Sequence, residues 1–392
     1  MRRQGSPVSA AAPKPSYLEF FAGGGMARAG LGDGWTCLFA NDFDARKAAA
    51  YRDNWGADSI TVADIASLTS RDLPGRADLA WGSFPCQDLS LAGIQAGLAG
   101  NRSGTFFPFW RLIRSLGAEG RAPSLIALEN VCGALTSHGG DDFQAIAAAF
   151  ADAGYAFGAL VIDAALFTPQ SRPRLFMVGV RDDLAIPRAL REAGPRQPFH
   201  TPALVAAVGR LSPDARDRFV WWRLSPPPPR ARRFVDEIEA APGDVSWHSQ
   251  ADTARLLEMM SPRHRAKVEA ARAAGGVQVG GVYRRTRREP DGRRVQRAEA
   301  RFDDTAGCLR TPAGGSSRQT LLVVDGPLIR SRLISARETA RLMGLPESYR
   351  LPKRYTDAYH LTGDGVVVPV VRALAAQLFE PLLAAWAESR AA

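Results

Sequence analysis

The sequence predicts an α/β protein with a parallel sheet covered on both faces by helices, joined to a smaller and less regular second domain. Short apolar runs alternate with helical patterns over residues 16–180, and this alternation is typical of a buried parallel sheet. This alternation of apolar runs and helical patterns stops near residue 181 and returns near residue 303. We therefore expect a core domain made of residues 16–180 and 303–392, with residues 181–302 as the second domain.

The first core segment supplies the elements of the sheet in order. Its apolar runs predict strands and its amphipathic stretches predict helices. Strands are expected at 17–22, 35–40, 78–81, 125–128, 159–163 and 176–180, and helices at 45–55, 107–116 and 143–153. In such folds ligands bind at the carboxyl ends of the strands, so residues that follow a strand are the first candidates for a site.

The second domain lacks this regularity. A run of four prolines at 226–229 excludes a helix or a central strand there. Residues 251–274 are helical in character, and Pro290-Asp291-Gly292 lies between two basic arms, which predicts a hairpin. In the returning core, a capping box at Ser335 opens a helix, and residues 373–387 predict a closing helix.

Composition and charge limit the class of protein. Hydrophobic residues make up 46% of the 392-residue chain and charged residues 23%, which excludes collagen-like and wholly disordered proteins. No apolar run approaches the roughly 18 residues of a membrane span, and residues 1–15 form a basic tail without the apolar stretch of a signal peptide. The four cysteines lie far apart without a CxxC pair, which favours a reducing, cytoplasmic setting and argues against structural zinc.

The basic charge is concentrated in the second domain. Residues 181–301 carry 24 basic and 15 acidic side chains, which is +9 of the net charge of +10. Arginine greatly outnumbers lysine in the whole chain, and a GC-rich genome explains that bias, but it does not explain the clustering. A basic segment of this kind indicates a surface that faces a polyanion, with nucleic acid as the leading candidate.

A glycine turn follows the first predicted strand. Residues 17–30 read as strand, glycine turn and helix, and Asp42 follows Gly23 by 19 residues. An acid at this offset is placed to bind ribose hydroxyls, while Phe43 could lie against an adenine and Asp64 could accept from its amino group. Similar turns occur without a nucleotide, and the pattern does not separate a dinucleotide from S-adenosylmethionine.

Chemically active side chains follow other strands. Cys86 lies in a loop stiffened by Pro85, and Glu129 ends the strand that starts at Leu125. Arg172 and Arg174 precede a third strand. A lone cysteine is most often an inert core residue, but here it lies at the ligand-binding edge, and neighbouring arginines lower the pKa of a thiol.

These motifs, taken in order, resemble those of the 5-cytosine DNA methyltransferases. GSFPCQDLSLAG around Cys86 resembles the nucleophile loop of that family, and ENV at Glu129 resembles its acidic motif. FAGGG at 21–25, QSRPR at 170–174 and RETARLMGLP at 337–346 resemble three further motifs. The resemblance covers about residues 16–180 and 303–380. It implies a Rossmann-like, S-adenosylmethionine-dependent methyltransferase domain with a target-recognition domain at 181–302.

The resemblance also implies the reaction and the roles of the active residues. Cys86 would add to C6 of a flipped-out cytosine in a specific duplex DNA sequence. Glu129 would hold N3 and the 4-amino group, and Arg172 and Arg174 would bind the base or its phosphates. C5 would then take the methyl group of S-adenosylmethionine. The residues implied for the cofactor are Phe21, Ala22, Gly23, Gly25, Asp42, Phe43, Asp64, Ile65, Pro85, Phe106, Asp364, Gly365 and Val366.

The chain departs from the family pattern at three places. Glu19 stands where the family usually has an aspartate, and Met26 replaces the last glycine of the loop. The usual Gly-Asn-Ser-Val is here Gly-Asp-Gly-Val, with Asp364 and Gly365 in the middle. We expect Asp364 to contact the recognition domain or the amino group of the cofactor, so that cofactor binding survives the change.

Contacts to DNA are expected from a basic hairpin and a glycine-rich loop. The hairpin at 281–301 is rich in arginine, which binds guanine through two hydrogen bonds; a hairpin that contacts only phosphates is the alternative. The loop after Cys86 is expected to close over the minor groove. The DNA-binding candidates are Ser90, Gln95, Arg284, Arg285, Arg287, Arg288, Arg293, Arg294 and Arg297.

Three other functions compete with a DNA methyltransferase. A tRNA cytosine-5 methyltransferase would share the motifs, but the basic domain favours duplex DNA. A catalytically silent DNA-binding regulator is disfavoured by the intact set of Cys86, Glu129 and Arg172. A nicotinamide oxidoreductase has no use for the Cys86 loop. The expected partners are double-stranded DNA and, genetically, a restriction endonuclease, with the protein acting as a monomer in the bacterial cytoplasm.

Overall fold

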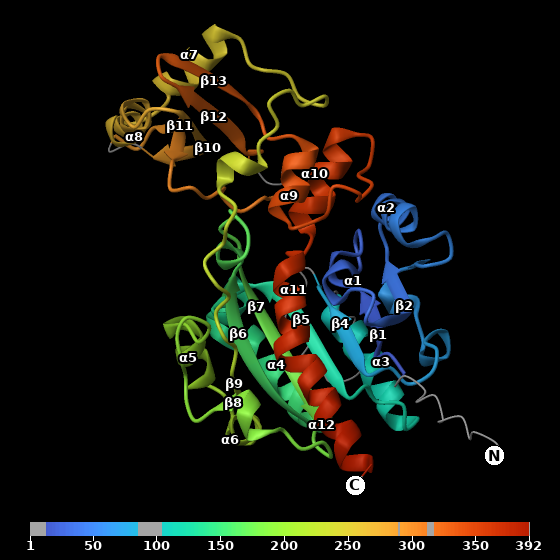
Figure 1. Cartoon of the computed structure of the whole chain (residues 1–392). Coiled ribbons are helices and arrows are strands. Elements are labelled where there is room, and N and C mark those ends of the chain that lie inside the picture. Colours follow the sequence, from blue (N-terminus) through green and yellow to red (C-terminus); the bar gives the residue numbers. More distant parts are fainter. Residues whose placement is uncertain (1–12, 85–103, 289–290, 312–316, 392) are drawn as a thin grey trace, which may run out of the picture.

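The computed structural model describes residues 13–84, 104–288, 291–311 and 317–391. The chain forms a larger α/β unit and a smaller unit above it, with helices α9 (Ala336–Leu342) and α10 (Tyr355–Asp364) between them (Figure 1). The tail and the loop that contains Cys86 lie largely or wholly outside the described residues.

The larger unit is built on a seven-stranded sheet with the order β3-β2-β1-β4-β5-β7-β6. The first five strands of that order run parallel, as expected. β7 is antiparallel to both β5 and β6, so the sheet is mixed. The short connection at 164–172 explains this difference, because a parallel crossover needs a dozen or more residues. The strands are β1 (Ser16–Phe20), β2 (Thr36–Asp42), β3 (Thr61–Val62), β4 (Leu79–Gly82), β5 (Leu125–Val131), β6 (Tyr155–Asp163) and β7 (Pro173–Arg181).

Helices cover both faces of this sheet, because its strands are apolar on both sides. Along β1, Tyr17 belongs to one buried core and Leu18 to the other. The first core includes residues of α1 (Met26–Leu31), α11 (Val368–Leu374) and α12 (Glu380–Ala391), and the second includes residues of α3 (Phe106–Ala118) and α4 (Asp141–Asp152). α2 (Ala45–Trp55) has the bounds that the sequence predicts.

The carboxyl-terminal helical stretch is long and apolar. By length and composition Tyr355–Ser389 could cross a membrane, which the apolar runs of the sequence did not predict, and half of its most apolar window is buried inside the fold. Val371 lies against Gly30 of α1 so closely that a Cβ at Gly30 would meet it at 2.4 Å. The apolar composition of this stretch thus serves the core of the larger unit.

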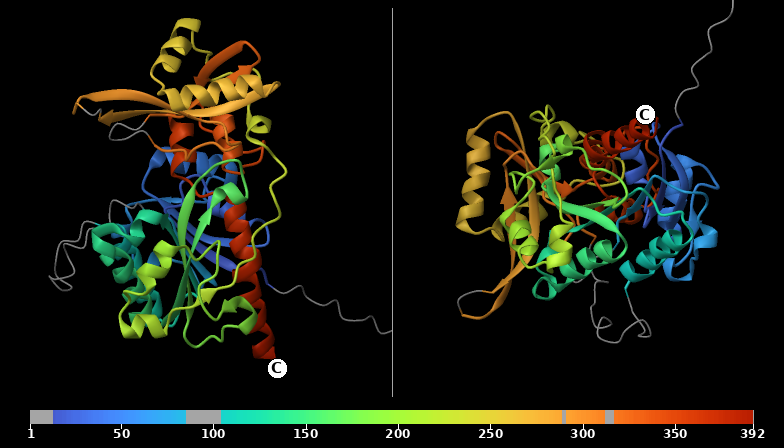
Figure 2. Two further views of the ribbon diagram at one scale, coloured as in Figure 1. Left: turned by 90° about the vertical axis from the view of Figure 1, so that its left-hand side faces the viewer. Right: turned by 90° about the horizontal axis from the view of Figure 1, so that it is seen from below.

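The smaller unit is a four-stranded antiparallel sheet with the order β11-β10-β12-β13. β10 (Val277–Arg288) and β11 (Arg294–Arg301) form the hairpin that the sequence predicts, and it projects sideways in Figure 2. β12 (Thr320–Asp325) and β13 (Leu328–Leu333) complete the sheet. The single helix expected at 251–274 is two helices, α7 (Gln250–Glu258) and α8 (Pro262–Ala273), because a proline opens a helix but disrupts its interior.

Two segments lie in a different unit from the one that the sequence predicts. Residues 182–224 pack on the larger sheet, where the buried Trp222 donates from Nε1 to the carbonyl of Val178 at 3.2 Å. β12 and β13, expected in the core domain, pair with β10 in the smaller sheet. The elements of the first segment are α5 (Pro202–Val208), α6 (Pro213–Asp217), β8 (Arg191–Glu192) and β9 (Trp221–Trp222).

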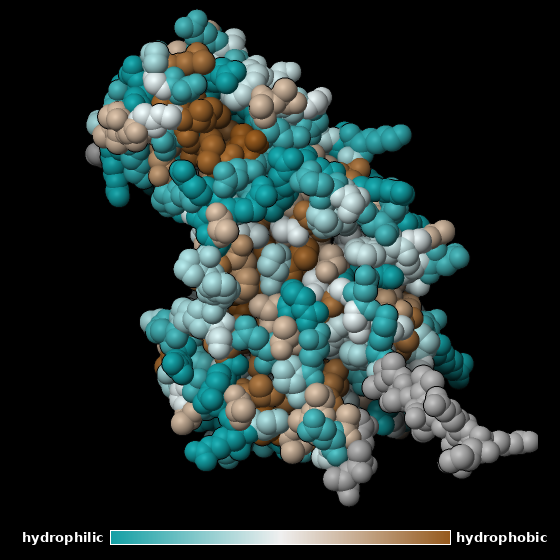
Figure 3. Space-filling view, in the orientation of Figure 1, coloured by the Kyte–Doolittle hydropathy of each residue, from teal (hydrophilic) through white to brown (hydrophobic). Residues whose placement is uncertain are grey.

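The surface in view is mostly hydrophilic, with an apolar area over the smaller unit (Figure 3). Among the large hydrophobic side chains of the described segments, Phe43 is the most exposed, at 71%. It follows β2 at the carboxyl edge of the larger sheet. The most exposed of these side chains therefore lies at the edge where this fold binds ligands.

Candidate active site

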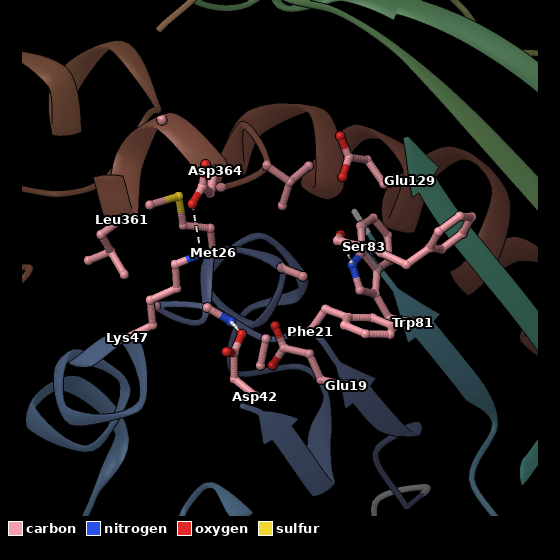
Figure 4. Close-up of a pocket in the computed structure, with 18 of the residues that line it drawn as sticks. Glu19, Phe21, Met26, Asp42, Lys47, Trp81, Ser83, Glu129, Leu361 and Asp364 are labelled. Atoms are coloured by element: carbon pink, nitrogen blue, oxygen red, sulfur yellow. Dashed lines mark hydrogen bonds and ion pairs between the residues drawn. The ribbon is translucent and has the colours of Figure 1, made fainter. Parts of the chain in front are cut away.

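A cavity of about 360 Å³ opens at the carboxyl edge of the larger sheet. This volume falls within the range of roughly 300–1,000 Å³ of small-molecule sites. Figure 4 shows Glu19 and Phe21 at the end of β1, Asp42 at the end of β2 and Glu129 near the end of β5, all around this cavity. Asp364, from α10, lies on the opposite side. The cavity therefore brings the glycine loop together with Glu129 and Asp364, which are distant from it in the sequence.

The glycine loop is held in shape by Asp42. Gly23 has a positive φ of 56° and donates from its amide to Asp42 Oδ2 at 2.8 Å. The other carboxylate oxygen accepts from the amide of Asp44 at 2.8 Å. Phe21, beside the loop, has φ 57° although it is not glycine, and such a conformation is costly for a bulky residue. Phe21, Ala22, Gly23 and Phe43 line the cavity with Asp42.

Glu19 is a buried acid that faces this cavity. Its Oε2 accepts from the Tyr51 hydroxyl at 3.0 Å, while Oε1 is buried with no hydrogen-bond partner among the described residues. Burial raises the pKa of Glu19 to about 7, although the hydrogen bond from Tyr51 opposes the shift. The sequence drew attention to Glu19 only as a departure from a family pattern, so its place in the cavity is a finding of the structure.

The other end of the cavity holds an ion pair. Arg174 Nε lies 3.1 Å from Glu129 Oε1, and both side chains are largely buried. The next residue, Asn130, donates from Nδ2 to the carbonyl of Phe84 at 3.2 Å. Phe84 is the last described residue before the segment that contains Pro85 and Cys86. The structure thus fixes the acid and the start of the thiol loop at the ends of neighbouring strands.

Arg172 has a different environment from Arg174. Its guanidinium is buried and donates to the carbonyls of Leu309 at 2.9 Å and of Gly363 and Gly365 at 2.8 Å each. Burial lowers its pKa to about 10, so it remains charged at neutral pH. The sequence resemblance predicts that Arg172 binds the substrate. In the structure its terminal nitrogens hold three backbone carbonyls, although the side chain also lines the cavity.

Asp364 closes the cavity from the side of α10. Its Oδ2 lies 2.7 Å from Lys47 Nζ, and its Oδ1 accepts from the Thr311 hydroxyl. Gly365 follows, and a Cβ there would lie 2.2 Å from Met26 Sδ. Asp364, Gly365 and Val366 line the cavity as expected. No sequence signal pointed to Lys47, because a lysine on the polar face of a helix is common.

Other predicted cofactor residues lie outside the lining of this cavity. Asp64 accepts from the amide of Ala66 at 2.8 Å and so caps a short helical turn. Ile65 and Phe106 are buried in the core of the larger unit, and Gly25 serves the turn with φ 76°. The remaining predicted residues Pro85, Cys86, Ser90 and Gln95 lie outside the described residues.

The predicted DNA-binding arginines lie on the hairpin of the smaller unit. Arg285 pairs with Arg297 across the two strands, and Glu299 forms ion pairs with both Arg285 and Arg287. Arg284, Arg288, Arg293 and Arg294 are exposed. A groove of about 740 Å³ runs from this hairpin to Cys308, whose Sγ lies 3.5 Å from a terminal nitrogen of Arg172. The basic lining residues are Lys267, Arg284, Arg285, Arg301 and Arg310, with His264 beside them.

Comparisons with known proteins agree on a class. The crystal structure of the S. pombe Dnmt2 methyltransferase matches this fold with a TM-score of 0.58 and 18% identity, covering 94% of this chain and 99% of its own. A family model described as C-5 cytosine-specific DNA methylase matches residues 16–380. The type II methyltransferase M.NlaX of Neisseria lactamica is 26% identical over 368 residues, covering 92% of this chain and 95% of its own. M.HhaI of Haemophilus parahaemolyticus is 25% identical over 361 residues, covering 92% of each.

The mixed sheet, the glycine loop and the cavity define a Rossmann-like methyltransferase. The chain belongs to the C-5 cytosine-specific DNA methylase family. It is an enzyme that transfers a methyl group from S-adenosylmethionine to C5 of cytosine in DNA. The cavity fits this cofactor in chemistry, because it combines acids that suit ribose hydroxyls and an ammonium group with the exposed Phe43 ring and a buried, unpartnered oxygen on Glu19.

Proposed function

We propose that the enzyme methylates a cytosine in a specific duplex DNA sequence through a bond between Cys86 and C6 of the flipped base. The observation that carries this proposal is the buried Glu129–Arg174 pair, which faces the same cavity as the glycine loop. Glu129 and the methyl group of S-adenosylmethionine would then lie in the same cavity. Asn130, hydrogen-bonded to Phe84, joins the acid to the loop of the thiol.

Each residue has a defined part in this reaction. The Cys86 thiolate adds to C6, and the electron pair moves toward C5. Glu129, oriented by Arg174, holds the cytosine edge and stabilises the charge that develops on the ring. When bound, S-adenosylmethionine supplies the methyl group that C5 takes. A base then takes the C5 proton, and the electrons of that bond re-form the C5–C6 double bond as the Cys86 thiolate leaves C6. Asp42 and Phe43 would hold the ribose and the adenine of the cofactor.

The groove between the hairpin and Cys308 is the proposed DNA channel. It joins the arginines of the smaller unit to the side of Arg172 and Arg174. A duplex in this groove would place phosphates against Lys267 and the groove-facing arginines, and a flipped base would reach the cavity from there. Arg287, which lies on the hairpin, is partly neutralised by Glu299, so we expect Arg284 to contribute more to phosphate binding.

The names of the relatives suggest a biological setting. Both M.NlaX and M.HhaI are called type II methyltransferases. On this basis we propose that the enzyme protects DNA as the modification half of a restriction–modification pair. We further propose that it acts as a monomer in the bacterial cytoplasm. The restriction–modification setting predicts a restriction enzyme that cleaves the site found by bisulfite sequencing. That enzyme should fail to cleave DNA from cells that express the methyltransferase.

Bisulfite sequencing of DNA from cells that express the enzyme tests the proposed function. We expect 5-methylcytosine at one sequence in DNA from cells with the wild-type chain and none with Cys86→Ser. Transfer of labelled methyl groups to purified duplex DNA and to tRNA then separates the two substrates. Incorporation into tRNA alone, or methylation of DNA by the serine variant, would contradict the proposal.

A further inference from the structure

An ion pair lies at the edge of the cofactor cavity, between elements that are distant in sequence. Lys47 is on α2 and Asp364 ends α10, and Nζ lies 2.7 Å from Oδ2. Both side chains line the cavity, and Figure 4 shows them meeting above the glycine loop. An aspartate at this place, on its own, would repel the carboxylate of S-adenosylmethionine. The paired lysine removes that repulsion.

The aspartate is fixed from several directions. Thr311 donates its hydroxyl to Asp364 Oδ1. The carbonyls on either side, of Gly363 and Gly365, each accept from the buried Arg172 guanidinium at 2.8 Å. The backbone and the carboxylate of Asp364 are thus both held in place, so Asp364 can fix the position of the Lys47 ammonium.

Lys47 retains donors for a ligand. An ammonium group has three N–H donors, and within the described segments one of them is used, on Asp364. The other basic groups that line the cavity are already engaged, because Arg172 donates to carbonyls and Arg174 pairs with Glu129. The Lys47 side chain lines the cavity and is 22% exposed, so a molecule in the cavity can contact it.

We propose that Lys47 binds the carboxylate of S-adenosylmethionine and that Asp364, held by Thr311, is the residue that positions it. The lysine then shares its donors between the protein carboxylate and the cofactor carboxylate. This assignment rests on the cofactor of the family and on the cavity, and it does not depend on the bond between Cys86 and cytosine.

Two ligands that differ by one group test the role of Lys47. Isothermal titration of the whole chain measures Kd for S-adenosylmethionine and for decarboxylated S-adenosylmethionine, which lacks the carboxylate. We expect Lys47→Met to raise Kd for S-adenosylmethionine at least tenfold and to change Kd for the decarboxylated ligand less than twofold. Arg46→Met is the matched control, because Arg46 is the neighbouring residue, is 67% exposed and pairs with Asp44 and Asp357 outside the lining of the cavity.

The proposal is overturned if Lys47→Met changes both affinities equally or changes neither. An equal loss would mean that the lysine only shapes the cavity. Because these readouts are binding constants in the absence of DNA, they can fail while Cys86 still proves to be the nucleophile.

A double-mutant cycle tests the role of Asp364. We expect Asp364→Asn to weaken S-adenosylmethionine binding about threefold to fivefold in the wild-type background, because Lys47 loses its anchor. In the Lys47→Met background the same change should no longer weaken binding and should instead tighten it, because it removes an unpaired negative charge beside the cofactor carboxylate. Such non-additivity marks residues that act together. Tighter or unchanged binding by the single Asp364→Asn variant would overturn the positioning role.

Discussion

Single residues in the cavity have environments that their type alone does not predict. Arg172 and Arg174 are two positions apart, yet one guanidinium holds backbone carbonyls and the other holds Glu129. Both arginines match one sequence motif, so the motif gave them one role. The environment of each is decided by segments such as Leu309 and Gly365, which are distant in the sequence.

Substitution separates the two arginines. We expect Arg172→Met to destabilise the fold by about 3 kcal/mol, because it leaves three carbonyls, two of them buried, without their donor. Arg174→Met should destabilise the fold less, because its side chain has one ion-pair partner at 3.1 Å and does not hold three backbone carbonyls, but it should abolish methyl transfer. Urea unfolding and a labelled-methyl assay measure the two effects. Equal destabilisation by both variants would contradict this division.

Glu19 predicts a pH dependence of stability. Burial raises its pKa from an ordinary value near 4.5 to about 7, so between these values the folded chain keeps a proton that the unfolded chain releases. The wild type therefore loses stability relative to Glu19→Gln as the pH rises through this interval. We expect the variant to gain about 1–3 kcal/mol on the wild type between pH 5 and pH 8, as measured by urea unfolding.

The exposed Glu269→Gln serves as the control for this experiment, because its side chain is 65% exposed. It should change stability by the same small amount at both pH values. A Glu19→Gln variant that gains nothing on the wild type as the pH rises would contradict the raised pKa of the buried Glu19 carboxyl group.

At the scale of elements, two departures from the family pattern compensate each other. Met26 begins α1, where the family has glycine, and Gly365 follows α10, where the family has serine. The Met26 side chain fills the space that a Cβ at Gly365 would need. A large residue on one element therefore requires a small one on the other.

This pairing is testable by rescue. We expect Gly365→Ala to push Met26 toward the cavity that it lines, and so to raise Kd for S-adenosylmethionine several-fold. Met26→Ala in the same chain should restore much of the affinity, because the space is freed. Titration of single and double variants measures the coupling, and an additive result would contradict the compensation.

The sequence predicted elements better than it predicted their partners. The bounds of α2 and the hairpin β10–β11 follow from local patterns, namely an amphipathic period and a turn between basic arms. The antiparallel direction of β7 was not predicted. It follows from the short connection between β6 and β7, whose length is clear only when the bounds of both strands are known. The ion pair of Lys47 with Asp364 was not predicted either, since it joins distant elements.

At the scale of the whole molecule, a short segment joins the smaller unit to the active site. Residue Ala306 accepts from Ser171 at 2.9 Å and donates to Pro169 at 2.7 Å, so the chain leaving the hairpin is bound to the segment before β7. Gln170, fully buried, accepts from Leu309 at 3.2 Å. The groove of basic residues is thus attached directly to the segment that carries Arg172.

The groove predicts a salt-dependent binding of DNA. We expect Arg284→Ala to weaken binding of a duplex of any sequence and to reduce the slope of log K against log salt by about one, as for a phosphate contact. Fluorescence anisotropy from 50 to 300 mM salt measures the slope. Arg255→Ala is the control, because Arg255 is exposed on α7 and outside the groove lining. Equal slopes for the wild type and Arg284→Ala would contradict a phosphate contact at Arg284.

Mass spectrometry of a trapped complex shows whether Cys86 bonds to the target cytosine. The enzyme is incubated with S-adenosylmethionine and a duplex that carries 5-fluorocytosine at the site found by bisulfite sequencing, because fluorine at C5 prevents release of the thiol. We expect a stable protein–DNA adduct that maps to Cys86 and contains the transferred methyl group. An adduct at Cys37, Cys132 or Cys308, or no adduct from an enzyme that methylates the same sequence, would contradict this expectation.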